Sequence, residues 1–328
     1  MIKRVLLGTA LVITLAIGYG TFTFFSFKAG LPEPAGELRT FALSHAGLQR
    51  SYNVYRPVSL PDNAPVVFVL HGSMGSGLGM RDMSAREFDM IADREGWLVV
   101  YPDGFENHWN GCRSTADYTA NVSNIDDVGF LSLVVQSLAN DYAIDATRVY
   151  ITGVSNGGHM AYRMALEAPG VFAAYAPMAA SLPAPETFGC GRLNQPVSLA
   201  IFNGTQDPVN PYLGGAVSVM GNDSRGVVLS SAETAAYWRE LAGLDKAARE
   251  LVHPERDGDT TTRIVEQRWG EAPGYEVRLY TMEGSGHTMP TLTSWMPDWL
   301  AALLGGNAGD LSGAEEALSF FSSHRLEQ

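Results

Sequence analysis

The chain has 328 residues, of which 46% are hydrophobic, so it is long enough to bury a sizeable core. Its formal net charge is −13 and no run of Lys and Arg follows the first residues, which argues against nucleic acid as a partner. The chain contains neither a His-Glu-x-x-His motif nor a Cys-x-x-Cys motif, so the sequence predicts no metal and no other cofactor.

Residues 1–28 differ from the rest of the chain in being mostly apolar after a basic start. A basic start precedes an uncharged apolar stretch over residues 5–27, which is long enough for a membrane span of ~20 residues. We expect either an uncleaved membrane anchor or a cleaved signal peptide, and in both cases a protein outside the cytoplasm, periplasmic or secreted. We expect three parts after this segment: a short linker over 29–37, one folded domain over 38–304, and a tail over 305–328 without an evident place in the fold.

The first part of the domain predicts strands at an edge and then in the centre of a sheet. Alternating apolar and polar residues over 38–44 and 51–56 predict two antiparallel edge strands. The apolar run 65–70 predicts a central strand. A loop of small residues, 71–77, follows it, and there the backbone N–H of Ser73 could help to stabilise an oxyanion.

A helix over 86–94 and a strand over 97–101 then lead to a long polar loop, 102–124. Loops of this length inside a compact domain are usually functional, so we expect this one to form a wall of a substrate cleft, with Trp109 in it. The acidic pair at the start of 126–142 predicts N-cap carboxylates of the next helix.

The stretch around Ser155 is the most informative part of the chain. A β-branched apolar run over 149–154 leads into Gly-x-Ser-x-Gly, with glycines at 153 and 157, and a helical pattern follows to about Leu166. A strand, a tight turn carrying one serine and a helix are typical of the nucleophile elbow of an α/β-hydrolase. The alternative is that Ser155 only caps the helix.

The second half supplies two polar candidates that directly follow predicted strands. Asp207 comes after the strand 197–202, and His287 comes after the strand 275–281. These elements predict an α/β fold with a mostly parallel central sheet and helices on both faces. The other expected elements are strands over 172–180 and 263–269 and helices over 231–241 and 293–304.

The order Ser155, Asp207, His287 is that of the nucleophile, acid and base in α/β-hydrolases. An imidazole can take the serine proton near neutral pH, while a carboxylate fixes its tautomer. The backbone N–H groups of Ser73 and Asn156 would stabilise the oxyanion. The alternative is that the histidine is structural and the aspartate a turn residue. Other candidates for the acid do not directly follow a buried strand: Asp223, Asp257 and Asp259.

The chain has two cysteines, Cys112 and Cys190. Both fall in loops expected at the sheet edge where Ser155 lies. Outside the cytoplasm a disulfide between them is permitted, and the alternative is two unrelated buried thiols.

Seven motifs in this order resemble the esterase/poly(3-hydroxybutyrate) depolymerase family, which includes feruloyl and acetyl-xylan esterases. The resemblance implies one exported α/β-hydrolase domain over about 41–304, with Ser155, Asp207 and His287 as a triad. It also implies a disulfide near the active site, which favours the pairing Cys112–Cys190. One departure is Met289, where the family usually has tryptophan after His-Thr. The motifs are residues 70–72, 101–104, 109–110, 127–130, 148–158, 204–209 and 286–288.

We therefore expect a serine carboxylesterase that forms an acyl-enzyme on soluble small-molecule or oligomeric esters of the feruloyl or acetyl type. Trp109, Tyr212 and Met289 are expected to line an apolar, partly aromatic cleft. One alternative is a hydrolase of poly(3-hydroxybutyrate) oligomers. Another is a non-catalytic binding protein, and a peptidase or acyltransferase on the same scaffold also remains open, because a fold does not fix its chemistry.

Overall fold

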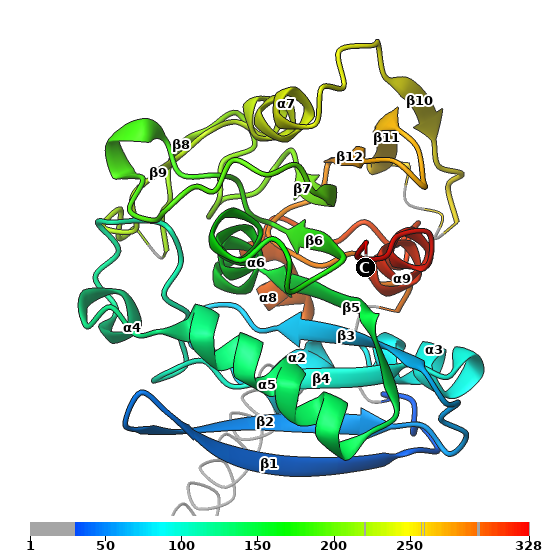
Figure 1. The fold of residues 1–328 in the computed structure, drawn as a ribbon. Helices are drawn as coiled ribbons and strands as arrows, with labels where there is room; N and C mark the ends of the chain where they lie inside the picture. The colour runs from blue at the N-terminus through cyan, green and yellow to red at the C-terminus, as the bar shows by residue number, and fades with distance from the viewer. Residues whose placement is uncertain (1–29, 220, 257, 259, 294–295, 328) are drawn as a thin grey trace, which may run out of the picture.

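The computed structural model describes residues 30–327 except 220, 257, 259 and 294–295 (Figure 1). The predicted leader, including the apolar stretch 5–27, therefore lies outside the described residues. Among the residues that are described, no helix combines the length and the apolar character needed to cross a bilayer.

One large twisted sheet organises the molecule (Figure 1). It has ten strands in the order β1-β2-β4-β3-β5-β6-β7-β12-β11-β10. The strands from β4 to β12 in this order pair in parallel, and antiparallel strands complete both ends. The fold class is thus the predicted α/β one. The strands are β1 (Glu37–His45), β2 (Leu48–Arg56), β3 (Ala64–Leu70), β4 (Leu98–Pro102), β5 (Ile144–Val154), β6 (Ala174–Met178), β7 (Ser198–Gly204), β10 (Arg249–Val252), β11 (Arg263–Gly270) and β12 (Glu276–Glu283), with β8 (Gly215–Ala216) and β9 (Val227–Val228) forming a separate pair.

Helices cover both faces of the sheet. On β3, Val66, Phe68 and Leu70 face one core cluster, and Val67 and Val69 face the other. Both faces of a central parallel strand are buried, which explains its unbroken apolar sequence. Helices α5 (Asp127–Asp141), α6 (Asn156–Glu167) and α7 (Ser231–Leu241) cover the first face, and α2 (Gly77–Met83), α3 (Glu87–Glu95) and α9 (Gly313–Ser322) cover the second. The short α4 (Thr119–Val122), a 3₁₀ turn (Pro185–Thr187) and α8 (Asp298–Leu303) lie in connections.

The expectation that residues 305–328 have no place in the fold is wrong. Phe320 and Phe321 on α9 are fully buried. The ring of Phe321 stacks on Tyr150 of the central strand β5, with ring centres 4.9 Å apart, and the Tyr150 hydroxyl donates to the His324 carbonyl at 2.6 Å. The helical spacing of the apolar residues between Leu311 and Phe321 is the sequence signal for this packing.

Two other predicted elements differ in detail. The helix expected over 293–304 is only α8, because Pro297 occupies its N-cap and a proline disfavours helical backbone before it. Asp126 caps α5 by accepting from the Gly129 N–H, as expected. Asp127 instead is buried and pairs with Arg50 at 2.6 Å.

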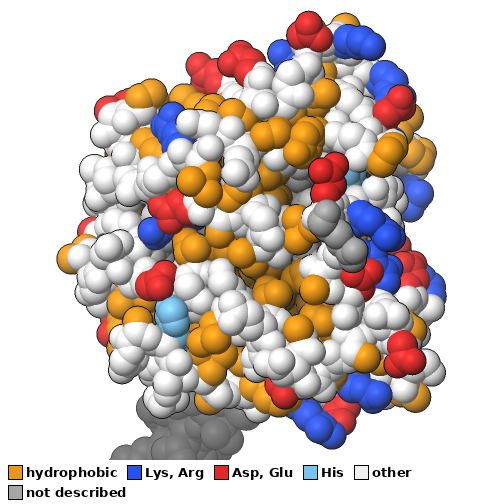
Figure 2. All heavy atoms as spheres, in the orientation of Figure 1, with side chains coloured by type: hydrophobic (Ala, Val, Ile, Leu, Met, Phe, Trp, Pro, Cys, Tyr) orange, Lys and Arg blue, Asp and Glu red, His pale blue; other side chains and the backbone are white. Residues whose placement is uncertain are grey.

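On the face shown in Figure 2, acidic and basic groups are interspersed near the edge, and hydrophobic side chains gather toward the middle.

Candidate active site

Ser155 lies in a sharp turn between β5 and α6, as the motif predicts. Its backbone angles are φ 56° and ψ −118°, in the positive-φ region that side chains other than glycine rarely adopt. The Ser155 N–H donates to the Met178 carbonyl at 2.8 Å, and a Cβ on Gly157 would lie 2.5 Å from the Leu70 carbonyl oxygen. The glycine is therefore required for the close approach of α6 to β3.

Asp207 and His287 meet at the ends of two adjacent parallel strands. Asp207 follows β7, His287 follows β12, and His287 Nδ1 lies 2.7 Å from Asp207 Oδ2. The other carboxylate oxygen accepts from the N–H groups of Val209 at 2.8 Å and Asn210 at 2.7 Å. Because the Asp207 carboxylate accepts, the imidazole carries its proton on Nδ1, which leaves Nε2 able to accept one.

Three other aspartates were candidates for the acid. Asp223 is exposed at the surface, and Asp257 and Asp259 lie outside the described residues.

Ser155, His287 and Ser73 all line one cavity of about 420 Å³. The loop after β3 passes directly beside Ser155, since a Cβ on Gly72 would lie 3.4 Å from the Ser155 Cβ and 4.0 Å from its Oγ. The sheet edge thus brings together four segments that are far apart in sequence, because the carboxyl ends of parallel strands meet at the same edge.

Asn156, the residue after Ser155, joins the elbow to the long loop. Its buried side chain accepts from the Trp109 N–H at 2.7 Å, and donates to the Trp109 carbonyl at 2.9 Å and to the Tyr118 hydroxyl at 3.0 Å. Its own backbone N–H is at the first position of α6, where a helix offers no internal acceptor. This N–H is therefore suited to an anionic ligand atom.

His71 fixes the loop that carries Ser73. Its Nδ1 donates to the Gly72 carbonyl at 2.7 Å, and its Nε2 accepts from the Gly104 N–H at 2.9 Å. Burial lowers the pKa of His71, so the neutral imidazole that these two bonds require is the stable form.

None of the three predicted substrate contacts lines this cavity. The predictions for Trp109 and Met289, which are buried, are wrong, and that for Tyr212 stays a prediction. Trp109 is fully buried and donates from Nε1 to the His71 carbonyl at 3.0 Å. Tyr212 bonds the Thr281 hydroxyl at 2.7 Å, and Met289 is buried in the core. Each apolar side chain contributes more by burial in the core than it would at a solvent-open wall.

The observed wall is aliphatic. Several separate segments of the chain supply it, so no single motif predicts it. The helical spacing of Leu300 and Leu303 on α8 and of Leu304 at its C-cap is the local sequence signal for this wall. The apolar lining residues are Met74, Met83, Val154, Pro208, Val209, Val219, Leu300, Leu303 and Leu304.

Cys112 and Cys190 form a disulfide, as the resemblance implied. The bridge joins residues 78 apart, with Cα atoms 5.0 Å apart. It connects the loop that contains Trp109 to the segment after the 3₁₀ turn, and the Gly189 N–H donates to the Cys112 carbonyl beside it at 2.7 Å.

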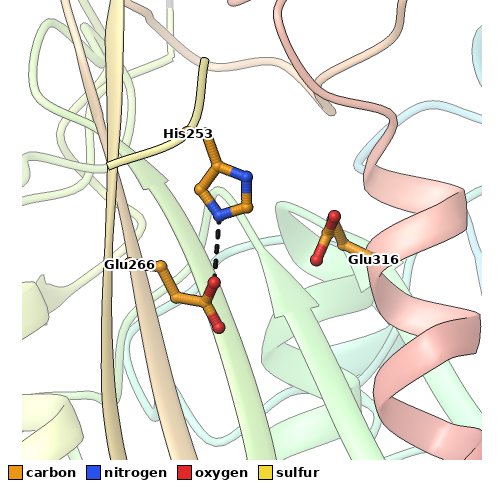
Figure 3. Close-up of side chains that lie close together, drawn as sticks. All are labelled: His253, Glu266 and Glu316. Atoms are coloured by element: carbon orange, nitrogen blue, oxygen red, sulfur yellow. Dashed lines mark hydrogen bonds and ion pairs between the residues drawn. The ribbon is translucent and has the colours of Figure 1, made fainter. Parts of the chain in front are cut away.

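A second cluster of titratable groups lies apart from this cavity, where His253, Glu266 and Glu316 approach one another (Figure 3). His253 Nε2 lies 2.9 Å from Glu266 Oε2. Two guanidinium groups also reach Glu266: Arg268 at 2.7 Å and Arg278 at 3.5 Å. Burial alone raises the pKa of Glu266, but these partners lower it to about 2. A cation here would face both arginines, so the cluster is an ion-pair network.

Comparison with known proteins shows what the chain is similar to. The family model described as "Esterase PHB depolymerase" matches residues 50–184. A putative esterase, NocK, from Nocardia uniformis subsp. tsuyamanensis is 29% identical over 84% of this chain and 80% of its own. The bifunctional acetylxylan esterase/xylanase XynS20E from Neocallimastix patriciarum is 31% identical over 74% of this chain, but over only 31% of its own length.

Among solved structures, an acetyl xylan esterase from Aspergillus awamori matches 82% of this chain and 99% of its own, with a TM-score of 0.55 at 18% identity. This likeness concerns the fold, which is that of an α/β-hydrolase. The chain is thus similar to the esterase/poly(3-hydroxybutyrate) depolymerase family. These relationships indicate esterase activity.

Proposed function

We propose that the protein is a serine carboxylesterase that hydrolyses soluble esters through a covalent acyl-enzyme. The observation that carries the proposal is the hydrogen bond between Asp207 and His287, with His287 and Ser155 lining the same cavity. Ser155 is the nucleophile, His287 the general base and acid, and Asp207 the group that orients the imidazole and stabilises its cationic form.

The reaction has two halves. In the first, Ser155 Oγ attacks the ester carbonyl carbon and its proton passes to Nε2 of His287. The oxyanion is stabilised by the backbone N–H groups of Ser73 and Asn156, and the proton then goes to the leaving alcohol as the C–O bond breaks. In the second half, His287 takes a proton from a water that attacks the acyl-enzyme carbonyl. It returns this proton to Ser155 Oγ as the bond between Oγ and the acyl carbon breaks, and the free acid leaves.

The lining of the cavity bears on the substrate. Its apolar side chains are aliphatic, so an acetyl or other aliphatic acyl group matches it better than a hydroxycinnamoyl group. We therefore expect acetyl-type esters to be better substrates than feruloyl esters. Oligomers of 3-hydroxybutyrate are the second candidate, because their repeating unit is aliphatic.

We also propose a location outside the cytoplasm. The disulfide Cys112–Cys190 supports it, since such bonds persist in oxidising compartments. Whether residues 1–28 anchor the protein or are cleaved stays a prediction.

Removing the nucleophile or the base tests the mechanism. Ser155→Ala and His287→Ala should each lower kcat on p-nitrophenyl acetate by at least ~10³-fold, because the triad acts as a unit. Ser59→Ala, at an exposed serine, is the matched control and should retain wild-type turnover. Near-normal turnover in either triad variant, with an unchanged melting temperature, would refute the assignment.

A second experiment separates the candidate functions. A fluorophosphonate probe should label Ser155 in the wild type, whereas a non-catalytic binding protein would remain unlabelled. Comparing kcat/KM for p-nitrophenyl acetate, methyl ferulate and a 3-hydroxybutyrate trimer then ranks the substrates. Turnover of the trimer alone would favour the oligomer hydrolase.

A further inference from the structure

Arg225 joins the two elements that carry the proposed oxyanion donors. It lies on the segment between β8 and β9, and its side chain is only 12% exposed. Its Nη1 donates to the Ser73 hydroxyl oxygen at 3.1 Å. Its guanidinium carbon lies 5.2 Å from the ring centre of Tyr118, whose hydroxyl accepts from the Asn156 side chain. One cation thus contacts Ser73 directly and Asn156 through a single aromatic ring.

The direction of the bond to Ser73 is fixed by chemistry. A guanidinium group has no acceptor atom, so the Ser73 oxygen accepts and its own proton is left for another partner. Among the described residues, this hydroxyl makes no other hydrogen bond with the protein. A bond from a charged donor also polarises the O–H group and makes it a better donor.

The Ser73 hydroxyl lies where its proton can be donated to a bound substrate. Ser73 lines the cavity that contains Ser155 and His287, beside the glycine that touches Ser155. Arg225 is not among the residues that line this cavity, so it reaches the reacting atoms only through other groups. Asp117, whose Oδ1 lies 3.7 Å from Arg225 Nε, contributes to holding the guanidinium in place.

We propose that the Ser73 hydroxyl is a third oxyanion donor, beside the backbone N–H groups of Ser73 and Asn156, and that Arg225 is the positioning residue that orients and polarises it. This inference rests on the proposed esterase function. It adds to that function a side-chain donor, the Ser73 hydroxyl, and a cation that binds this hydroxyl, Arg225.

Ser73→Ala is the direct test, because it keeps the backbone N–H and removes only the hydroxyl. We expect kcat to fall about 10²-fold with little change in KM, since the lost interaction forms only as the oxyanion forms. Arg225→Met should lower kcat about tenfold, the effect of losing a hydrogen bond from a charged group. Arg225→Lys, which keeps a charged donor, should restore part of this loss.

A double-mutant cycle shows whether Arg225 acts through Ser73. If it does, Ser73→Ala/Arg225→Met should be no slower than Ser73→Ala alone, because the hydroxyl that Arg225 orients is already gone. A trifluoromethyl ketone forms an oxyanion adduct with the serine. Its inhibition constant should rise across the variants in proportion to the fall in kcat/KM. A purely structural role would change the melting temperature without this proportionality.

The outcomes are distinct. Arg249→Met, at an exposed arginine, is the control and should match the wild type. If wild-type protein hydrolyses esters and is labelled at Ser155, while Ser73→Ala keeps wild-type kcat, the inference is overturned and the proposed function stands. If the losses of the two single variants multiply in the double variant, Arg225 does not act through Ser73. A wild type that neither turns over nor is labelled would defeat the esterase proposal itself.

Discussion

The backbone of Ser155 is held in an unfavourable conformation by its surroundings. A positive φ at a non-glycine residue costs about 1–3 kcal/mol and persists only where neighbouring contacts determine it. Here the Ser155 N–H donates to Met178 at 2.8 Å, and the Ser155 carbonyl accepts from the His159 N–H at 2.9 Å. These bonds tie the serine to β6 on one side and to α6 on the other, so the side chain is presented at the sheet edge.

Trp109 provides a residue-scale prediction about stability. Trp109→Phe removes the Nε1–H that satisfies the buried His71 carbonyl, and an unsatisfied buried acceptor costs about 1–3 kcal/mol. The free energy of unfolding in urea should fall by that amount. The ratio of kcat/KM for methyl ferulate to that for p-nitrophenyl acetate should not change, because Trp109 lies outside the cavity lining. A changed ratio at unchanged stability would instead make Trp109 a substrate contact.

The contrast between Trp109 and Asp207 shows which residues a sequence can predict. Asp207 and His287 could be located because each follows an apolar strand within a few residues, and parallel strands end at one edge. The burial of Trp109 could not be predicted in this way, because its Nε1–H binds the His71 carbonyl on a different loop. Arg225 carried no local signal at all, since its contacts with Ser73 and Tyr118 join three distant segments.

At the scale of elements, α9 completes the second face of the sheet. It contacts α3 and β5, and its N-cap Ser312 accepts from the Glu315 N–H at 3.1 Å. An amphipathic helix buries its apolar side against whatever sheet surface is left uncovered. The region from Leu311 onward had the spacing for this, but a sequence pattern does not say which surface remains open.

Phe321→Ala tests whether α9 belongs to the core. Phe321 is fully buried against Tyr150, and truncating a buried phenylalanine costs about 3–5 kcal/mol. We expect a clear drop in melting temperature and in the free energy of unfolding. Ser319→Ala, at an exposed position of the same helix, is the matched control. Equal stability of both variants would mean that α9 packs only loosely on the sheet.

At the scale of the whole molecule, one partly buried carboxylate joins three segments that are distant in sequence. Glu87 on α3 accepts from the Leu292 N–H at 3.1 Å and from the Ser312 hydroxyl at 2.5 Å. Leu292 precedes α8, whose leucines line the cavity, and Ser312 begins α9. The ionisation of Glu87 therefore affects the region where the active-site wall and the C-terminal helix meet.

The pKa of Glu87 predicts how stability depends on pH. Burial is the main cause that raises this pKa to about 7, and the nearby Glu315 adds to it, while the bonds from Ser312 and Leu292 lower it. A carboxyl pKa above its unfolded value means that the folded protein binds more protons between about pH 4.5 and 7. The contribution of Glu87 to stability is thus complete below about pH 4.5 and is lost as the pH rises through 7.

Glu87→Gln removes this ionisation, because glutamine stays neutral at every pH. The difference in unfolding free energy between the variant and the wild type should shift by about 2–3 kcal/mol in favour of the variant from pH 5 to pH 8. Urea unfolding at both pH values measures it. Glu271→Gln, at an exposed glutamate, is the control and should show a much smaller shift. A Glu87→Gln curve parallel to the wild type across this range would mean that Glu87 ionises as readily in the folded chain as in the unfolded one.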